Sequence, residues 1–445
     1  MKPRPPLPPG PFLVVGLARS GIAAALALRA RGEQVIGCDV GSAQDGPLRE
    51  AAQRLSREGV EVHLDASGDA LAARAGTLIK SPGVPQHAAV VAAARARGIP
   101  VLGELELAWR LLPNEFVAVT GTNGKTTTTE WIGHIHREAH APVTVVGNVG
   151  TAASTLVGAV DPEVTVVCET SSFQLEDTQA FAPEVAVLLN LTADHLDRHR
   201  TMEDYAAAKL SLFANQDHDD VAILPETFER EISGRAKRIS FGPGGTAGLA
   251  ERDGRLWWQD EALLAVQEIS LPGAHNRENA MAAAAAALAR WLDRDAVARG
   301  LKSFPGVAHR LELIAVKDGV AYVNDSKATN VASTLVALDA YQGGVHLIAG
   351  GRSKQQDFSP LAVPVAARCR AVYLIGEGAL ELGTALESSG VPLRAVRNLE
   401  RALSAARDAA RPDEVVLLSP ACASYDQYRD FEARGEHFRA LVEAL

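Results

Sequence analysis

Cysteine is scarce in this chain of 445 residues. The four cysteines, Cys38, Cys168, Cys369 and Cys422, lie far apart and form no Cys-x-x-Cys pair. Structural zinc sites use closely spaced cysteines, and disulfide-stabilised domains carry them at a higher density. The sequence therefore predicts neither a zinc site nor a disulfide framework, and it fits the reducing environment of the cytoplasm.

Long apolar runs and an excess of positive charge are also missing. No apolar stretch reaches the length of a membrane span, and the proline-rich residues 1–11 lack the apolar core of a signal peptide. The formal net charge is −10, so a nucleic-acid polyanion would be repelled except at a local basic patch. We expect a cytoplasmic protein that acts on small molecules, with no membrane or nucleic-acid partner.

Lysine is the third scarcity, because only nine of the 44 basic residues are Lys. Arg stays protonated, whereas Lys can lose its proton when its surroundings lower its pKa. Lysines in motif-like surroundings occur at Lys125, Lys209, Lys327 and Lys354. At these positions, chemistry that Arg cannot perform becomes a better explanation than surface charge.

Strands and helices alternate along a chain that is too long for one ordinary core. The pattern predicts an α/β fold of three domains: a Rossmann-like parallel sheet in residues 1–103, a P-loop-type ATPase sheet in 104–308, and a second Rossmann-like domain in 309–445. Strands are expected at residues 12–16, 34–39, 77–80, 117–120, 164–168, 185–189, 221–224, 321–323, 345–349, 371–375 and 414–418. Helices are expected at residues 22–31, 90–97, 281–289 and 432–445.

A phosphate-binding loop is indicated after the strand at 117–120. The residues that follow this strand are Gly121, Thr122, Asn123, Gly124, Lys125, Thr126 and Thr127. Amides of such a loop and the dipole of the next helix form a phosphate cradle. Lys125 would bridge nucleotide phosphates and the Thr126 hydroxyl would hold Mg²⁺. The full P-loop pattern has glycine where Val119 stands, so an ordinary turn remains an alternative.

Polar residues also follow the next strands. Glu169 suits a Mg²⁺ ligand, because Mg²⁺ prefers hard oxygen donors. His195 is either a second metal ligand or phosphate contact, or a loop histidine satisfied by its neighbours. Lys209 lies on an expected helix, where it is either a surface lysine paired with an acid such as Asp204 or part of the metal site.

The first domain carries an incomplete dinucleotide fingerprint, Gly16-Leu17-Ala18-Arg19-Ser20-Gly21, in which Ala18 occupies the place of the second glycine. Asp39 follows about where a ribose-binding acid would stand. The segment predicts either a diphosphate-bearing nucleotide or simple strand–helix packing. An NAD(P) site is disfavoured, because it would leave Lys125 without a use.

Further clusters of cations and hydrogen-bond donors lie near domain boundaries and strand ends, at residues 271–279, 305–310, 324–330, 349–354 and 418–427. Any one of them could be a capped turn. In a chain of net negative charge, their recurrence predicts one site for an anionic ligand.

The motifs occur in a fixed order, at residues 120–126, 170–176, 194–195, 271–273, 309–310, 324–330 and 419–424. Together they resemble the Mur ligases of peptidoglycan synthesis across essentially the whole chain. Within that family, residues 171–176, 324–330 and 418–424 resemble the branch that adds D-glutamate. The resemblance implies an ATP-dependent, ADP-forming ligase that adds D-glutamate to UDP-N-acetylmuramoyl-L-alanine through an acyl phosphate. It also implies ATP and two Mg²⁺ ions, a monomer, and a cytoplasmic role in cell-wall synthesis, cell shape and cell division.

The same resemblance implies roles for individual residues. Catalysis is implied for Lys125, His195 and Lys209, and metal binding for Thr126, Glu169, His195 and a Lys209 carbamylated by CO₂. ATP contacts are implied for Gly121, Thr122, Asn123, Gly124, Lys125, Thr126, Thr127, Asn279, Arg310, Asp325 and Lys327. Contacts to the UDP-linked substrate are implied for Leu17, Ala18, Asp39, Ser81, Gly83, Asn148 and Ser171. Contacts to D-glutamate are implied for Thr329, Lys354, Ser424 and Phe431.

The chain departs from the family pattern at the expected UDP site. Ala18 replaces a frequent Thr or Ser, which removes one hydroxyl from the diphosphate, and Arg19 is the candidate to compensate. Val40 and Gly41 replace a Thr and an Arg found in some members, which leaves the uracil contacts open.

Other functions fit parts of the sequence. A related ligase that adds a different amino acid, such as another Mur ligase or a folylpolyglutamate synthase, would differ in the pocket around Ser424 and Phe431. An NAD(P)-dependent oxidoreductase would need a complete glycine fingerprint. A non-catalytic P-loop regulator would not need His195 and Lys209.

Overall fold

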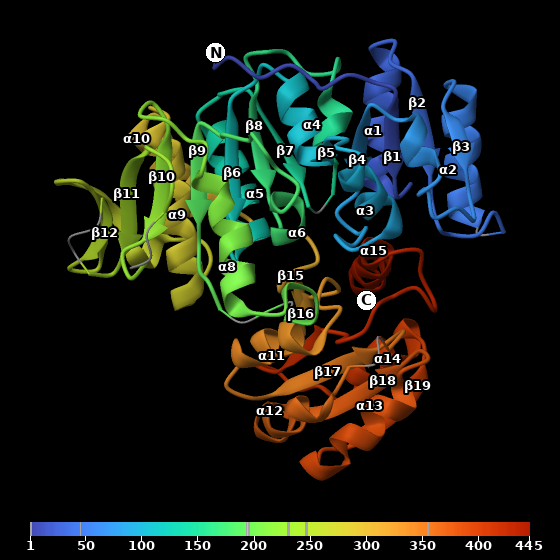
Figure 1. The fold of residues 1–445 in the computed structure, drawn as a ribbon. Coiled ribbons are helices and arrows are strands. Elements are labelled where there is room, and N and C mark those ends of the chain that lie inside the picture. The colour runs from blue at the N-terminus through green and yellow to red at the C-terminus, as the bar shows by residue number, and fades with distance from the viewer. Residues whose placement is uncertain are drawn as a thin grey trace. The chain divides into compact units, whose positions relative to one another are not determined.

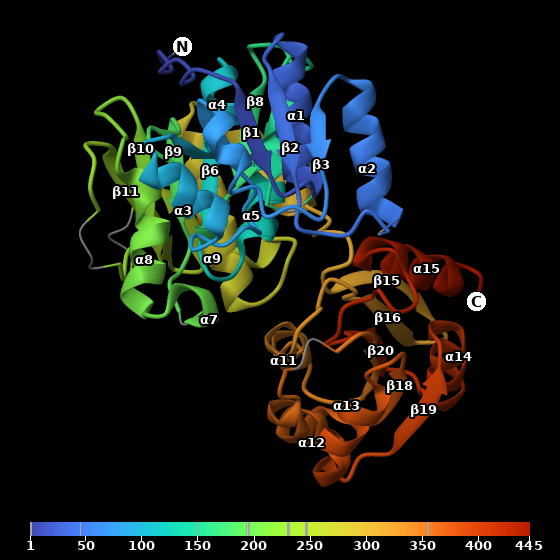
Figure 2. The ribbon, with the colours of Figure 1, turned by 45° about the vertical axis from the view of Figure 1, so that its right-hand side comes forward.

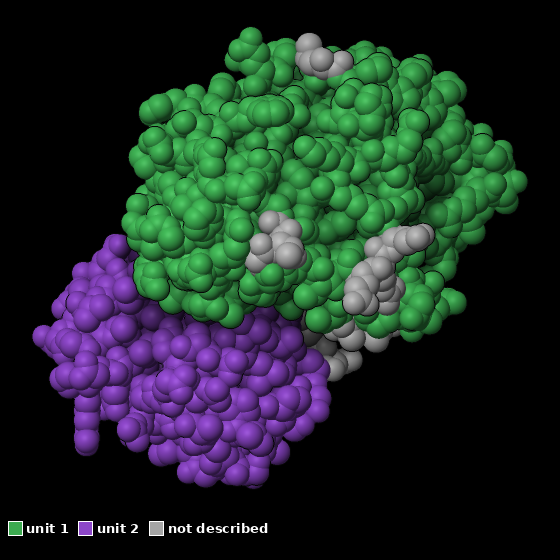
Figure 3. Space-filling view, turned by 90° about the vertical axis from the view of Figure 1, so that its left-hand side faces the viewer, with its two compact units in different colours: residues 1–305 green, residues 306–445 purple. Residues whose placement is uncertain are grey.

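The computed structural model describes residues 2–44, 46–148, 150–192, 194, 196–228, 232–244, 248–353 and 356–445, with only the backbone for 196 and 197. The chain divides into two compact units, unit 1 (residues 1–305) and unit 2 (residues 306–445), which have separate colours in Figure 3. Unit 1 contains two β-sheets and unit 2 contains one (Figure 1).

The first sheet of unit 1 has five parallel strands in the order β3-β2-β1-β4-β5. Its strands are β1 (Phe12–Val15), β2 (Val35–Cys38), β3 (Glu61–His63), β4 (Thr77–Lys80) and β5 (Val101–Gly103). Its helices are α1 (Arg19–Ala30), α2 (Gly46–Arg57), the 3₁₀ helix η1 (Leu71–Arg74) and α3 (Ala89–Ala96). The strand order reverses between β1 and β4, and ligands of open α/β sheets bind beyond the carboxyl ends of strands at such a point.

The second sheet of unit 1 has nine strands in the order β14-β13-β12-β11-β10-β9-β6-β8-β7. They are β6 (Phe116–Thr120), β7 (Val143–Gly147), β8 (Thr165–Glu169), β9 (Val185–Leu188), β10 (Val221–Pro225), β11 (Lys237–Gly242), β12 (Leu249–Arg252), β13 (Arg255–Trp258) and β14 (Glu261–Ala265). Neighbours from β7 to β12 pair in parallel, whereas β13 and β14 add an antiparallel edge.

Several helices accompany this second sheet. They are α4 (Glu104–Leu111), α5 (Lys125–Glu138), α6 (Ser172–Leu175), α7 (Leu196–His199), α8 (Met202–Leu210), α9 (Ala274–Ala289) and α10 (Arg294–Ser303), with 3₁₀ helices η2 (Ala153–Leu156), η3 (Ser211–Phe213) and η4 (Val266–Glu268). All five residues of β6 are buried between β8 and β9. This burial explains why β6 is a continuous apolar run ending in Thr, as parallel strands covered on both faces usually are.

An N-terminal arm, residues 2–11, runs along unit 1 before it enters β1 (Figure 1). Arg4 donates a hydrogen bond to Glu184 Oε1 at 3.0 Å, and its guanidinium lies 4.4 Å from the centre of the Trp109 ring. The second oxygen of Glu184 accepts the amide of Phe116, the first residue of β6, at 2.8 Å. The arm therefore fixes the strand that leads into the phosphate loop.

Unit 2 has a six-stranded sheet in the order β15-β16-β20-β17-β18-β19, in which only the β15–β16 pair is antiparallel. Its strands are β15 (Glu312–Lys317), β16 (Val320–Asn324), β17 (Val345–Gly350), β18 (Cys369–Ile375), β19 (Leu393–Arg397) and β20 (Val415–Leu418). Its helices are α11 (Val331–Asp339), α12 (Ala362–Arg368), α13 (Ala379–Leu386), α14 (Leu399–Ala409) and α15 (Phe431–Glu443), with η5 (Ser359–Leu361) and η6 (Glu387–Ser389). One core packs α11, α12 and α13 on one face, and a second packs α14 and α15 on the other (Figure 2).

The predicted α/β class with parallel-rich sheets is confirmed, and strands form at the expected positions. The predicted helix starts are less accurate: α1 begins at Arg19 and α9 at Ala274, each before the apolar periodicity becomes visible. Helix α2 is not predicted by the sequence pattern, because it is a polar helix with a single buried residue, Leu55. Among the described residues, no helix combines the length and apolar character needed to cross a membrane.

Candidate active site

The loop between β6 and α5 has the backbone geometry of a phosphate cradle. Gly121 and Gly124 have φ angles of 153° and 83°, conformations that favour glycine. A Cβ on Gly121 would lie 3.0 Å from Leu189 Cβ, so the loop is packed closely on the segment after β9. Gly124 is the N-cap of α5, which presents the first amides of the helix and the positive end of its dipole to this loop.

Lys125 folds back over this loop. Its Nζ donates to the carbonyl oxygens of Gly121 at 2.9 Å and Thr122 at 2.8 Å. The ammonium group therefore lies where it can meet a phosphate held by the loop amides. This is the position that the sequence predicts for a phosphate-bridging lysine, and the phosphate contact itself stays a prediction.

Asn190 braces the same loop from the carboxyl end of β9. Its Oδ1 accepts the amide of Asn123 at 2.8 Å, and its Nδ2 donates to the carbonyl oxygen of Asn123 at 3.1 Å. The sequence analysis assigns no role to Asn190. The available signal is its place directly after a strand that neighbours β6.

Thr126, Glu169 and Asn148 meet at the carboxyl ends of three adjacent strands. The Thr126 hydroxyl donates to Glu169 Oε2 at 2.7 Å, and Asn148 Nδ2 donates to Glu169 Oε1 at 3.1 Å. Glu169 is only 4% exposed. A carboxylate and a hydroxyl are the hard oxygen donors that Mg²⁺ prefers. The donor set thus fits a Mg²⁺ ion bound by Thr126 and Glu169.

Lys209 is buried beside the phosphate loop, with 1% of its surface exposed. Its Nζ donates to the carbonyl oxygen of Gly121 at 2.8 Å and lies 4.6 Å from the centre of the Tyr205 ring. The alternative interpretation of Lys209 as a surface lysine is wrong, because α8 turns this side chain into the protein. Sequence reasoning assigns no role to Tyr205, whose hydroxyl donates to Thr122 Oγ1 at 3.2 Å.

Burial lowers the pKa of Lys209 from 10.5 to about 7. The positive charge of Lys125 lowers this pKa further, whereas Asp194 and Glu169 oppose the shift. A lysine with such a pKa has a large neutral fraction at neutral pH, and a neutral amine is the reactive form of the side chain.

His195 lies outside the described residues, so neither interpretation of it is tested. The described part of the same segment contains a different histidine, His199, which sequence reasoning missed. His199 is buried, with Nε2 2.9 Å from Ser172 Oγ and Nδ1 3.2 Å from Glu176 Oε1. It connects α7 to α6.

Ser171 is the N-cap of α6 and forms a capping box with Gln174. Its hydroxyl accepts the Gln174 amide at 3.3 Å, and Gln174 Oε1 accepts the Ser171 amide at 3.0 Å. The box fixes the backbone immediately after Glu169. Ser171 therefore lies at the same strand end as the candidate metal ligands.

Asn279, predicted to contact adenine, lies next to the phosphate loop. A Cβ on Gly124 would collide with the Asn279 side-chain oxygen, and the φ of 83° at Gly124 favours glycine as well. Asn279 belongs to α9 and is 6% exposed. The structure thus brings it to the loop, and its contact to adenine stays a prediction.

Leu17, Asp39 and Ser81 come together at the switch point of the first sheet. The carboxylate of Asp39 accepts the amides of Leu17 at 2.7 Å and Gly41 at 2.8 Å, and Ser81 Oγ donates to the carbonyl oxygen of Gly16 at 2.7 Å. Both oxygens of Asp39 thus hold loop backbone, a structural role that the sequence does not indicate.

The departures at this end of the chain have structural counterparts. Ala18 is the N-cap of α1 and makes no side-chain capping bond, while Arg19 donates to the carbonyl oxygen of Gly150 at 3.2 Å. A Cβ on Gly41 would lie 2.6 Å from Leu48 Cδ2, so this loop cannot hold the Arg of other members without rearranging. Gly83, by contrast, has open space where a side chain would project, which suits a loop that a ligand approaches.

Asp325 is a buried carboxyl group directly after β16 in unit 2. It is 4% exposed, and its carboxyl accepts the Ser419 hydroxyl at 2.7 Å and the Leu311 amide at 3.2 Å. Burial raises the pKa of Asp325 from 3.8 to about 7, although these two bonds and the charges of Arg310 and Lys327 oppose the shift. Asp325, Arg310 and Lys327 thus share one electrostatic neighbourhood, and their contacts to ATP stay a prediction.

Arg434 is a buried cation to which sequence reasoning assigns no role. Its guanidinium donates to the Ser326 hydroxyl and carbonyl, both at 2.9 Å, and to the Cys422 carbonyl at 3.2 Å. Burial lowers the pKa of Arg434 to about 10, so it stays charged at neutral pH. It ties the loop after β16 to the loop after β20.

The predicted D-glutamate residues of unit 2 lie around these loops. Thr329 is half-buried in the loop after β16, Ser424 is buried after β20, and Phe431 begins α15, where its carbonyl accepts the Ser326 hydroxyl at 2.8 Å. Lys354 lies outside the described residues. Gln356, which the sequence does not single out, donates to the Ala421 carbonyl at 2.7 Å and accepts the Val331 amide at 3.1 Å.

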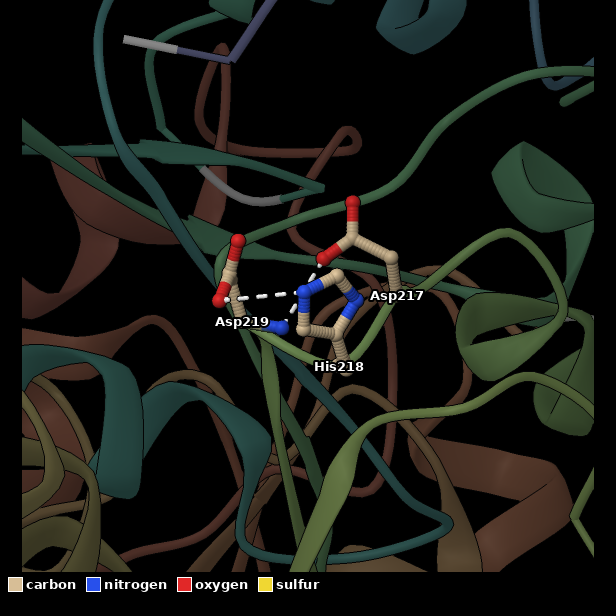
Figure 4. A group of neighbouring side chains, drawn as sticks. All are labelled: Asp217, His218 and Asp219. Carbon is tan, nitrogen blue, oxygen red and sulfur yellow. Dashed lines mark hydrogen bonds and ion pairs between the residues drawn. The ribbon is translucent and has the colours of Figure 1, made fainter.

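A second group of potential metal ligands, Asp217, His218 and Asp219, lies in the loop before β10 (Figure 4). Its members are partly or fully exposed, and the Asp217 carboxylate already pairs with Lys2 at 3.2 Å and accepts the Asp219 amide at 3.0 Å. This arrangement is a capped surface turn tied to the N-terminal arm.

Known proteins match both units. Residues 119–287 match the Mur ligase middle domain, and residues 309–422 match the Mur ligase glutamate ligase domain. The chain is 41% identical over 444 residues to the UDP-N-acetylmuramoylalanine--D-glutamate ligase of Acidobacterium capsulatum, covering 97% of this chain and 96% of that protein. It is 38% identical to the protein of the same name from Bacillus subtilis, covering 98% of this chain and 97% of that protein.

A solved structure shares the fold. The UDP-N-acetylmuramate-alanine ligase of Thermotoga maritima has a TM-score of 0.60 and 17% identity, with 98% of this chain and 100% of that chain covered. At this identity the likeness concerns the fold alone. The two domain matches and the full-length relatives decide the family, and the chain belongs to the Mur ligase family.

Proposed function

We propose that this chain is an ATP-dependent ligase that joins D-glutamate to UDP-N-acetylmuramoyl-L-alanine in peptidoglycan synthesis. Full-length relatives at about 40% identity carry the name of this activity. The observation that carries the proposal is the convergence of Lys125, Lys209 and the Thr126–Glu169 pair on one phosphate loop. This loop can hold a nucleotide phosphate beside a hard-oxygen metal site.

In the proposed reaction, the L-alanine carboxylate attacks the γ-phosphate of ATP and displaces ADP. The amine of D-glutamate then attacks the resulting acyl phosphate, an amide bond forms, and phosphate leaves. Lys125 and the amides that begin α5 would hold the β- and γ-phosphates in line with the carboxylate. Such positioning and charge stabilisation supply most of the catalysis in phosphoryl transfer.

Thr126 and Glu169 would hold one Mg²⁺ ion, which when bound neutralises phosphate charge. A second ion, with His195 and a carbamylated Lys209 as ligands, is the finer part of the proposal. Carbamylation joins the neutral amine nitrogen to the carbon of CO₂ and releases one proton, which turns a cation into an anionic oxygen ligand. The burial of Lys209 and its pKa of about 7 support this route, because the neutral amine is the form that reacts.

The remaining residue roles are those that the resemblance to the family implies. Leu17, Ala18, Asp39, Ser81 and Gly83 would contact the UDP part, and Asn148 and Ser171 the muramoyl-L-alanine part. Asn279, Arg310, Asp325 and Lys327 would complete the ATP contacts. Thr329, Lys354, Ser424 and Phe431 would bind D-glutamate. We further propose a monomer of the cytoplasm, with domain boundaries at 103/104 and 308/309 as the sequence suggests.

Phosphate release from ATP tests the function. We expect release only when UDP-N-acetylmuramoyl-L-alanine and D-glutamate are both present, with L-glutamate, L-lysine and meso-diaminopimelate as matched amino-acid controls. Release with another amino acid but not D-glutamate would favour a different amino-acid-adding ligase. If no phosphate is released with any of these amino acids and the protein instead reduces NAD(P)⁺ with any substrate, the oxidoreductase alternative is favoured.

A further inference from the structure

Arg198, in α7, contacts two other segments of unit 1 that the proposed function uses separately. It lies three residues after the predicted metal residue His195. Its guanidinium donates to the carbonyl oxygen of Val84 at 3.4 Å and pairs with Glu176 at 3.5 Å. It also stacks on the Phe173 ring, with the central guanidinium carbon 4.0 Å from the ring centre.

Val84 ends the turn that follows β4. The Val84 amide donates to the carbonyl oxygen of Ser81 at 3.0 Å, so Ser81 and Gly83, two predicted contacts of the UDP-linked substrate, belong to the same turn. Lys80 fixes this turn from inside: its Nζ donates to the Val84 carbonyl at 2.6 Å and pairs with Asp177 at 2.8 Å. The Val84 carbonyl oxygen therefore accepts hydrogen bonds from two cationic side chains, those of Lys80 and Arg198, which fix its position.

Phe173 and Glu176 belong to α6 and the residue after it. The helix is only four residues long, so its two ends are about 6 Å apart. Its N-cap is Ser171, which closely follows the strand end that carries Glu169. A shift at the C-terminal end of so short a helix moves the N-terminal end with it.

Charged and polar side chains from the neighbouring elements surround Arg198. Glu176 also accepts His199 at 3.2 Å and Gln86 at 3.4 Å, and Asp177 accepts Gln86 at 2.7 Å as well as Lys80. The Lys80–Asp177 pair is fully buried, with side-chain exposures of 0% and 2%, whereas Arg198 and Glu176 are each 20% exposed. The buried Lys80–Asp177 pair thus joins the end of β4 to the segment after α6, and Arg198 joins α7 to both.

We propose that Arg198 is a positioning residue that couples binding of the UDP-linked substrate to binding of Mg²⁺ with nucleotide. Substrate that orders the Ser81–Val84 turn would, through Arg198, hold α6, the helix that follows the candidate Mg²⁺ ligand Glu169. The inference rests on the proposed function, and it adds a residue that contacts neither substrate nor metal. Coupling of this kind is reciprocal, so it can be measured from either ligand.

The experiment measures Mg²⁺ binding by calorimetry on the full chain loaded with a non-hydrolysable ATP analogue, with and without UDP-N-acetylmuramoyl-L-alanine. In the unmodified protein we expect the substrate to tighten Mg²⁺ binding by about fivefold or more, the lower range for coupled sites. Arg198→Met should reduce this tightening by about threefold, so that little coupling remains. Mg²⁺ binding without substrate should change by less than about twofold.

Three further variants separate positioning from a general loss of folding. Arg198→Lys keeps the charge but cannot stack a planar group on Phe173 while reaching Val84 and Glu176, so it should restore only part of the coupling. Glu176→Gln should act on the same coupling, and the double variant should be non-additive. Arg299→Met removes an exposed arginine paired with Glu138 at 3.9 Å in the same unit and should leave the coupling unchanged.

Kinetics give a second measurement. Arg198→Met should raise the KM for the UDP-linked substrate several-fold at saturating ATP and Mg²⁺, and it should raise the KM for ATP by a similar factor at saturating UDP-linked substrate, because the coupling is reciprocal. Equal coupling in the Arg198→Met and unmodified proteins, or no coupling in either, would overturn the inference. If the unmodified protein does not bind UDP-N-acetylmuramoyl-L-alanine at all, the proposed function fails instead. If Arg198→Met does not fold, judged by its melting transition, the Arg198→Lys and Glu176→Gln comparison decides.

Discussion

Lys209 in unit 1 and Asp325 in unit 2 occupy comparable places and show opposite electrostatics. Lys209, in α8, donates to the loop that follows β6, Asp325 lies in the loop that follows β16, and each is almost completely buried. Burial lowers the pKa of Lys209 to about 7 and raises the pKa of Asp325 to about 7. The same physical cause therefore favours a neutral amine in one unit and a neutral acid in the other.

The two neutral groups can become charged in different ways. A neutral amine beside Lys125 can become an anion by reacting with CO₂, which would answer the positive charge around the phosphate loop. A neutral acid at Asp325, which accepts the Ser419 hydroxyl and the Leu311 amide, can regain its charge when a ligand hydroxyl donates to it and adds to the effect of Arg310 and Lys327. Lys209 would thus become an anion by a covalent reaction, whereas Asp325 would become an anion by losing its proton beside a ligand.

The largest effect should come from Lys209→Arg. Arg cannot form a carbamate and stays charged, so we expect ligase activity to fall by about a thousandfold, the upper range for losing one charge-stabilising group. Phosphate release is the measurement, and Lys237→Arg on an exposed strand residue is the matched control. Partial rescue of Lys209→Ala by short-chain carboxylates would sharpen the comparison. Full activity of Lys209→Arg would rule the carbamate out.

Asp325→Asn should have a smaller effect on activity. Asn can accept the Leu311 amide with Oδ1 and donate Nδ2 to the Ser419 hydroxyl oxygen, but it cannot become charged, so the loss should be about ten- to a hundredfold, the scale of about one to three kcal/mol for a charge-assisted hydrogen bond. The loss should appear mainly in the KM for ATP, measured at saturating Mg²⁺. An unchanged KM would remove Asp325 from the nucleotide site.

The pH dependence of stability should distinguish the two groups. Lys209 has a lowered pKa in the folded protein, so between pH 7 and 10.5 the unfolded chain binds more protons, and stability rises with pH. Lys209→Met removes this contribution. The melting temperature of the variant minus that of the unmodified protein should therefore fall by a few degrees from pH 7 to pH 10. A constant difference would contradict the lowered pKa.

Asp325 should give the opposite trend in a lower pH window, and a smaller one, because its shift is slightly smaller. Its pKa is raised in the folded protein, so between pH 3.8 and about 7 the folded chain binds more protons, and stability falls as pH rises. For Asp325→Asn, the melting temperature of the variant minus that of the unmodified protein should rise from pH 4 to pH 7. Parallel pH profiles would show that the carboxyl is already charged.

Local sequence patterns identify the groups at strand ends well. Lys125, Thr126 and Glu169 each follow or end a buried strand, and parallel strands bring their carboxyl ends to one edge, so Thr126 and Glu169 meet at 2.7 Å. Lys209 is harder to place, because helical spacing alone cannot tell a buried lysine from a surface one. The scarcity of lysine in an Arg-rich chain is the better indicator.

Groups whose partners are distant in sequence cannot be found in this way. Lys80 pairs with Asp177, 97 positions away, and both look like ordinary residues of a strand end and a helix end. Arg434 binds carbonyl groups of two loops, and backbone acceptors leave no trace in residue type. The sequence also contains no sign that Asp39 holds loop amides, since a ribose-binding acid and a capping acid have the same identity.

Hydrogen exchange at one backbone amide of β6 can report whether the N-terminal arm is docked. The amide of Phe116, at the start of β6, is held by Glu184, and the other oxygen of Glu184 holds Arg4. When the arm is docked, this amide should exchange its hydrogen slowly with solvent deuterium. When Arg4 is replaced, the same amide should exchange faster, so one peptide followed by mass spectrometry records how firmly the arm grips the strand that leads to the phosphate loop.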